Sequence, residues 1–233
     1  MEENFGDIFK KSYDLFLKNI KVFSIVFGIF FVPTLVLVFI GAGIMAFFKT
    51  ADGILPSILI LVSGISTVAI VLFSLFYSIA LIKTTHKAAQ GQPVDAVEMY
   101  KEAKDVFKPF AIVSILVFVK IILWSLLLIV PGIIFSVLYG FSSLSVIIDE
   151  KRGNGALVFS KTVIKSNLKE FLLKMLSLMG IMLLISFISS FLLLIPLIGV
   201  IFNEAVKAVL GIYALIFTYY LYQDLKNKTV AEV

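Results

Sequence analysis

Long uncharged runs alternate with short charged segments along this chain. The uncharged or nearly uncharged runs are Val22–Phe48, Gly53–Ile82, Pro109–Ile148 and Met175–Asn203. Lys120 is the one charged residue within them. A helix needs roughly 20 apolar residues to cross the hydrocarbon core of a bilayer, so each run can hold one crossing or a hairpin of two. The sequence therefore predicts an all-α, polytopic integral membrane protein.

The hairpin turns are marked by proline and glycine. We expect turns at Lys49–Gly53, Pro131–Gly132 and Pro196–Gly199. The resulting spans lie at about 21–47, 55–82, 109–130, 133–149, 170–195 and 200–223. The fourth span has an uncharged part of only 16 residues. That is about 24 Å of helix against a hydrocarbon core of about 30 Å, so the span tilts poorly, thins the bilayer or forms a re-entrant hairpin with the third.

Each predicted hairpin follows a charged segment with helical periodicity. Segments 5–20, 94–108 and 156–168 place apolar residues on one side and lysines on the other. We expect basic amphipathic helices that lie in the membrane interface, with apolar faces toward lipid and lysines toward anionic headgroups. Asp95 and Asn167 are expected to cap helices, and Pro109 is expected to end the second amphipathic helix.

The charged segments resemble one another, which predicts an internal repeat. Val106-Phe-Lys-Pro-Phe110 matches Asn167-Leu-Lys-Glu-Phe171, and Phe16-Leu-Lys-Asn-Ile20 matches both. The chain is thus interpreted as one membrane domain, 1–233, built from units of about 1–90, 91–152 and 153–233.

Composition and charge add an orientation. The chain is 61% hydrophobic with a formal net charge of +5, and all but three of its 20 Lys and Arg residues lie in segments 10–21, 83–108, 149–174 and 226–228. Short segments rich in Lys and Arg stay on the cytoplasmic side. We therefore expect a multi-pass protein of the cytoplasmic membrane with both termini inside. The mixed charges before the first run predict a retained span and no cleavable signal peptide.

Motifs for catalysis or cofactor binding are missing from the sequence. There is no cysteine and only one histidine, His86, so thiolate and paired-histidine sites are excluded. His86 itself is interpreted as an interfacial residue, with a pH-sensitive role as the alternative. No metalloprotease, serine-hydrolase or nucleotide-binding motif occurs. We expect no enzyme activity, no catalytic residue, no cofactor, no metal and no nucleic-acid partner.

Charges inside the predicted spans are candidates for an intramembrane site. Lys120 lies near the middle of the third span, and Glu204 and Lys207 lie in the sixth. Each charge is costly at the bilayer centre unless it is paired or hydrated. Glu204 and Lys207 are spaced to face each other on one helix, and a contact between Lys120 and Glu204 is also possible. These residues form an ion pair that fixes helix register, line a substrate or ion pathway, or extend to a membrane edge.

A second candidate site lies on the third amphipathic segment. Lys161, Lys165 and Lys169 are candidate contacts for anionic headgroups. The leading function is a lipid-interacting or membrane-organising protein that scaffolds partners, with a protein partner or a homo-oligomer left open. The alternative is a small-solute transporter or channel with its site at Lys120, Glu204 and Lys207.

Several short motifs resemble a known family. They are Pro131-Gly-Ile-Ile134, Val146-Ile-Ile-Asp-Glu-Lys-Arg-Gly153, Ala156-Leu157, Ser160 and Tyr219-Tyr-Leu-Tyr-Gln-Asp-Leu225. Together they resemble the membrane-domain family attached to some glycerophosphodiester phosphodiesterases and related stand-alone six-span prokaryotic proteins of unknown function. The resemblance implies an integral membrane domain of poorly defined function. The phosphodiesterase activity of that family belongs to a separate soluble barrel, so no catalytic residue is carried over.

Overall fold

Every element of the computed structural model is helical over the residues that it describes, which are 3–48, 55–194 and 198–231. The elements in chain order are α1 Phe5–Lys18, α2 Ile20–Phe48, α3 Leu55–Ala89, α4 Ala96–Leu127, α5 Ile129–Leu138, α6 Ser142–Ile148, α7 Asn154–Ser166, α8 Leu168–Ser190, a short 3-10 helix at Phe191–Leu194, and α9 Ile198–Ala231. The predicted all-α fold is confirmed.

Six of the described helical segments are long and apolar enough to cross a membrane. They are Ile20–Val38, Leu61–Ala89, Ala96–Leu127, Ile129–Ile148, Leu168–Ser190 and Phe202–Val230. These segments coincide with the six predicted spans, which supports a multi-pass membrane protein. The predicted turns at Lys49–Gly53 and Pro196–Gly199 fall wholly or partly outside the described residues.

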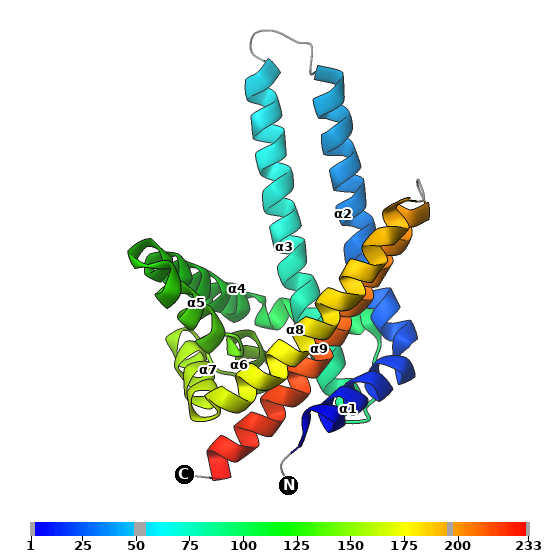
Figure 1. Cartoon of the computed structure of the whole chain (residues 1–233). Coiled ribbons are helices and arrows are strands. Elements are labelled where there is room, and N and C mark those ends of the chain that lie inside the picture. Colours follow the sequence, from blue (N-terminus) through cyan, green and yellow to red (C-terminus); the bar gives the residue numbers. More distant parts are fainter. Residues whose placement is uncertain (1–2, 49–54, 195–197, 232–233) are drawn as a thin grey trace.

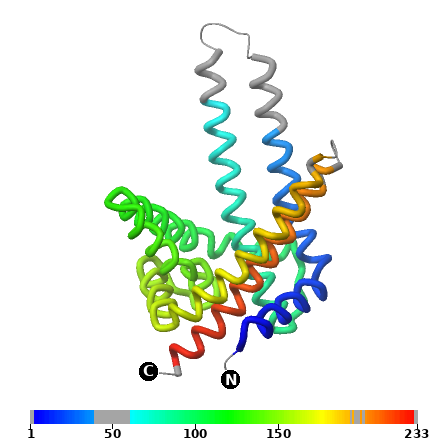
Figure 2. The backbone as a smooth tube through the Cα atoms, viewed as in Figure 1, coloured from blue at the N-terminus to red at the C-terminus, as the bar shows by residue number. Residues whose placement is uncertain are grey.

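Three helical hairpins diverge from a common base. Figure 1 shows α2–α3 rising from the base, α4–α5 leaving toward the left and α8–α9 leaving toward the right. The tube in Figure 2 follows the same path and places both chain ends beside the base. We use "base" for the region where α1, α6 and α7 pack against the hairpin helices, at the ends of those helices that lie away from the hairpin turns.

The buried core lies in this base. On α3, Ile79 and Ile82 are buried, whereas Leu61 and Ile65 farther along the same helix are more than 60% exposed. On α9, the buried stretch likewise includes Phe217 and lies away from the hairpin turn. Lipid chains are as apolar as leucine, so the outer halves of the hairpins need no protein cover. The base is where packing holds the hairpins together.

Two of the predicted repeat units share a joint between helices. Asn19 joins α1 to α2 as Asn167 joins α7 to α8, and each donates from its side-chain amide to the carbonyl four residues earlier. Aligned on this joint, the motif 19–23 corresponds to 167–171, three residues after the predicted match at 16–20, and 106–110 has the same lysine and phenylalanine spacing. The threefold repeat itself stays a prediction. Each motif ends in a buried phenylalanine: Phe23, Phe110 and Phe171.

Two local predictions about helix ends are corrected. α4 continues through Pro109, because Ala103 and Phe110 are buried on either side of it and packing keeps the helix together. The α4–α5 turn is at Leu128, and Pro131 lies inside α5. The side chain of Asp95 accepts from the Glu98 backbone amide at 2.8 Å, so this predicted cap is confirmed.

The amphipathic segments do not turn all their apolar residues toward lipid. On α1, Ile8 and Phe16 are buried against the protein, whereas Tyr13 and Leu17 are about half exposed. The ring of Phe5 lies 5.4 Å from that of Phe217 on α9. The buried faces of α1 and α7 pack on other helices of the chain, so only part of each apolar stripe is free to meet lipid. Asn167 is also no side-chain cap, because its amide donates backward into α7.

The fourth predicted span is two helices with a break between them. α5 ends at Leu138 and α6 begins at Ser142. The buried hydroxyl of Ser160 on α7 donates to the Leu138 carbonyl at 2.8 Å and accepts from the Phe141 amide at 3.0 Å. An unsatisfied backbone group costs several kcal/mol in an apolar region, so one side chain makes this break possible.

We predict that Ser160→Ala destabilises the protein by roughly 1–3 kcal/mol, because it leaves two buried backbone groups without a partner. The measurement is the free energy of unfolding in mixed micelles. Thr162→Ala on the same helix is the control, because Thr162 is exposed and donates only within α7. Equal stability of the two variants would contradict this role for Ser160.

Candidate functional site

Lys120 is held by α7 and not by α9. Its ammonium donates to the side-chain oxygen of Asn154 at 2.6 Å and lies 5.7 Å from the centre of the Tyr139 ring. Asn154 is the first residue of α7 and follows the charged turn after α6. The possible contact between Lys120 and Glu204 is absent from the structure.

Glu204 and Lys207 pair with each other on α9. The ion pair is 2.7 Å long, and both side chains are 53% exposed. The spacing of three residues thus brings them together as expected. α4–α5 and α9 leave the base in different directions (Figure 1). Lys120 bonds to Asn154, and Glu204 and Lys207 bond to each other. The three candidate residues do not form one site.

Lys161, Lys165 and Lys169 lie along one exposed edge of α7 and α8. Two shallow, open depressions adjoin on this edge and share Ser166. The first is lined by Val158, Lys161, Thr162, Lys165 and Ser166. The second is lined by Ser166, Asn167, Leu168, Lys169, Glu170, Leu173 and Lys174. We call the exposed row Lys161, Thr162, Lys165, Ser166 and Lys169 the basic α7–α8 surface.

The positive charge of this surface is not neutralised by the chain. Lys161 lies 5.9 Å from the centre of the Phe135 ring on α5. Within the described part of the chain, none of Lys161, Lys165 and Lys169 forms an ion pair. The nearest carboxylate along the chain, Glu170, bonds to other lysines. The surface is therefore suited to an anionic ligand.

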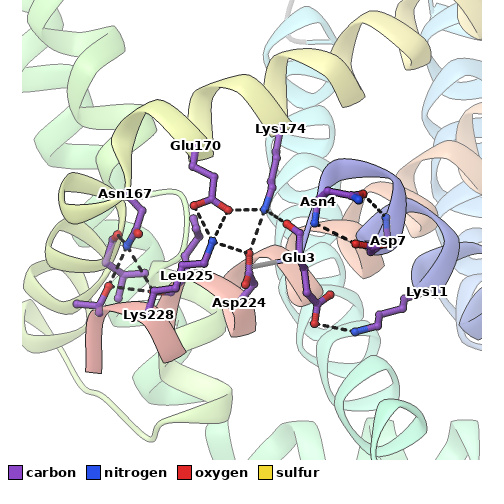
Figure 3. Close-up of polar contacts among 12 residues, drawn as sticks. Glu3, Asn4, Asp7, Lys11, Asn167, Glu170, Lys174, Asp224, Leu225 and Lys228 are labelled. Atoms are coloured by element: carbon purple, nitrogen blue, oxygen red, sulfur yellow. Dashed lines mark hydrogen bonds and ion pairs between the residues drawn. The ribbon is translucent and has the colours of Figure 1, made fainter. Parts of the chain in front are cut away.

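A largely buried ion-pair cluster around Lys174 is drawn in Figure 3. It adjoins the basic α7–α8 surface, because Glu170 and Lys174 line the second depression together with Lys169. Lys174 on α8 donates to Glu170, to Asp224 on α9 at 3.0 Å and to the backbone carbonyl of Glu3 at 2.5 Å. Lys228 donates to the two Glu170 oxygens at 2.6 and 2.7 Å. The side chains of Lys174 and Asp224 are only 8% and 6% exposed. The cluster ties α8, α9 and the segment before α1 together.

The sequence analysis missed this cluster because Lys174 ends a segment of exposed lysines. The repeat offers a signal in hindsight, because Lys174 lies three residues after Phe171. The equivalent residues after Phe23 and Phe110 are Val26 and Val113, which are buried. A lysine at a position that is apolar in the other two repeats indicates a buried partner.

A second polar contact anchors the end of α6 to α9. Tyr222 donates its hydroxyl to Asp149, and Lys226 pairs with the other oxygen of Asp149 at 2.5 Å. His86 on α3 bonds through its Nδ1 to the Tyr219 hydroxyl at 3.0 Å. His86 thus links two helices of the base, a role that its interpretation as an interfacial residue did not include.

These clusters differ in what they can do chemically. The Lys174 cluster contains two lysines and two carboxylates, so its charges cancel and it fits a structural role. The basic α7–α8 surface has positive charge to spare. Among the described residues, no group of three or more His, Asp or Glu side chains is placed to hold a metal ion.

No protein-family model, no curated protein and no solved structure matches this chain. The site is therefore interpreted from its own geometry.

We predict that Lys174→Met costs roughly 3 kcal/mol of stability, because removing one partner leaves a buried carboxylate poorly compensated. The free energy of unfolding in mixed micelles is the measurement. Lys169→Met on the same helix is the matched control and should change stability by less than about 0.5 kcal/mol, since Lys169 is exposed. If both variants are equally stable, the cluster does not hold α8 to α9.

Proposed function

We propose that this protein is a non-enzymatic, lipid-interacting protein of a prokaryotic cytoplasmic membrane, where it organises the membrane or scaffolds other proteins. Its site is the basic α7–α8 surface, which binds anionic lipid headgroups. The observation that carries the proposal is the row Lys161, Lys165 and Lys169, which is exposed and without ion pairs among the described residues.

The chemistry of the row suits a phosphate group. Lysine ammonium groups are compact charges on flexible stems, so they can follow a mobile headgroup. Near an anionic membrane surface each lysine contributes about 1 kcal/mol to binding. Ser166 lines both depressions and adds a hydroxyl beside the ammonium groups.

Apolar surface for an acyl chain lies next to these lysines. On α5, Ile133 and Ile134 are 59% and 51% exposed, and α5 packs against α7. Val158 lines the first depression and is 54% exposed. A headgroup on the lysines therefore leaves its acyl chains beside exposed apolar side chains.

α1 supports the orientation that this proposal requires. Tyr13 and Leu17 lie four residues apart on α1 and are exposed next to its buried face, and Ile20 at the start of α2 is exposed as well. Such a helix has one side on protein, one suited to lipid and one suited to water. Both chain ends lie at the same base (Figure 2), in agreement with our proposal that both termini are cytoplasmic.

The Glu204–Lys207 pair favours a second candidate function, a small-solute transporter or channel. An ion pair whose side chains are half exposed on an apolar helix needs water, lipid headgroups or another chain beside it. A pathway through Lys120 as well would require a partner surface, because this chain keeps Lys120 on another hairpin. For this reason lipid binding is the function that we place first.

We predict that the triple variant Lys161→Glu/Lys165→Glu/Lys169→Glu binds phosphatidylglycerol roughly a hundredfold more weakly than the native protein, at about 1 kcal/mol for each lysine. The measurement is titration of the protein in neutral detergent with fluorescent phosphatidylglycerol. Phosphatidylcholine titrated in the same way reports binding that does not depend on headgroup charge.

The triple Lys→Arg variant at the same positions is the matched control and should retain binding. Lys120→Met/Glu204→Gln/Lys207→Met tests the second candidate and should bind phosphatidylglycerol normally. Unchanged lipid selectivity in the Glu variant would refute the proposed site. Loss of binding in the variant at 120, 204 and 207 alone would move the site to those residues.

A further inference from the structure

The returning segment Ile129–Ile148 is long and apolar enough to cross a bilayer only if α5 and α6 are counted together, and the chain is broken between them. α5 has 10 residues, which extend about 15 Å at about 1.5 Å per residue, against a hydrocarbon core of about 30 Å. α6 does not extend it, because Ser142, Ser145 and Val146 of α6 are buried in the base. The returning chain thus enters the base at Leu138, where Ser160 of α7 satisfies the broken backbone.

Lys120 limits the depth of the outgoing helix. Its bond to Asn154 places the last third of α4 beside the start of α7, close to the charged turn that contains Arg152. Only seven residues of α4, 121–127, lie beyond this point. They add about 10 Å of helix, less than half of the hydrocarbon core. Figure 1 shows α4–α5 leaving the base sideways, whereas α2 and α3 rise from it.

The tip of this hairpin suits hydrocarbon. Leu126, Leu127, Leu128, Ile129 and Val130 are between 66% and 78% exposed. No polar side chain occurs from 126 to 135. A turn that reached water or headgroups on the far side would expose this whole apolar surface, at about 25 cal/mol for each Å².

The backbone of the tip also suits an apolar surrounding. One residue, Leu128, separates α4 from α5, and its amide donates to the Trp124 carbonyl at 3.1 Å. The Gly132 amide donates to the Leu128 carbonyl at 3.4 Å, and Pro131 has no amide hydrogen to satisfy. Few backbone groups are therefore left without partners, as hydrocarbon requires.

Close contact keeps the hairpin narrow. A Cβ atom on Gly132 would lie 3.0 Å from the Cα atom of Ser125, so only glycine permits this approach of α5 to α4. The rings of Trp124 and Phe135 stack with their centres 4.5 Å apart.

We propose that α4–α5 is a re-entrant hairpin: it enters the bilayer from the side on which α7 lies, turns within the hydrocarbon and returns to that side. The partner of its tip is the acyl region of that leaflet. The chain then crosses the membrane fully with α2, α3, α8 and α9, and its two ends stay on one side. This inference concerns depth and is independent of headgroup binding at the basic α7–α8 surface.

The depth of the tip can be measured because the chain has a single tryptophan. In Trp124→Phe/Ile129→Trp, the tryptophan is moved to the tip. After reconstitution in phosphatidylcholine vesicles, we expect bromine near the ends of the acyl chains to quench its fluorescence more than bromine near the glycerol. Trp124→Phe/Tyr13→Trp on α1 is the shallow reference and should show the opposite order. Stronger quenching of the tip by the shallow bromine would overturn the proposal.

Cysteine labelling supplies a second readout, since the native chain contains none. Ile129→Cys should escape a membrane-impermeant maleimide in intact and permeabilised vesicles, and react after denaturation in detergent. Arg152→Cys should be labelled from one side only, which marks the side on which α7 lies. Labelling of Ile129→Cys from the side opposite to Arg152 would establish a full crossing, and labelling from the Arg152 side would place the hairpin on the surface; either result refutes re-entry.

Discussion

Helices in hydrocarbon gain no hydrophobic free energy by leaving lipid for one another, so this fold depends on packing where its helices leave the bilayer. The core meets that requirement, because each outgoing helix (α2, α4 or α8) buries a phenylalanine in the base: Phe23, Phe110 or Phe171. Tyrosine hydroxyls strengthen the same region, as in the bond from Tyr100 to the Val26 carbonyl at 2.8 Å. The hairpins can diverge because nothing farther out is needed to hold them.

Lysines have three different environments in this molecule, and the differences separate structure from function. Lys174 is buried in a neutral cluster, where its loss would leave carboxylates exposed to a low dielectric. Lys120 bonds to the neutral side chain of Asn154 and thereby fixes the position of α4 against the start of α7. Lys161, Lys165 and Lys169 on the basic α7–α8 surface form no ion pair among the described residues. Of these three environments, the last is the one that leaves positive charge available to another molecule.

The sequence predicted the class of fold and the number of apolar segments, because both follow from the lengths of the uncharged runs between charged segments. It predicted Lys161, Lys165 and Lys169 as candidate headgroup contacts from a basic amphipathic segment, and the structure exposes all three although Asn167 separates α7 from α8. It could not predict that Lys174 is buried, because its partner Asp224 lies 50 residues away along the chain. A hydropathy profile scores each charged residue separately and carries no information about which charges pair. The turn at Leu128 contains neither proline nor glycine. The prediction therefore placed the turn at Pro131–Gly132, three residues too far toward the C-terminus.

The shallow α4–α5 hairpin has a mechanical consequence. A wedge that ends halfway through a bilayer adds cross-sectional area to one leaflet and none to the other. The leaflets can accommodate that mismatch only by bending or by exchanging lipid, so each copy carries a small preferred curvature. Many copies in one patch would add these preferences together, and the sign of the bend would be set by the leaflet that faces α7.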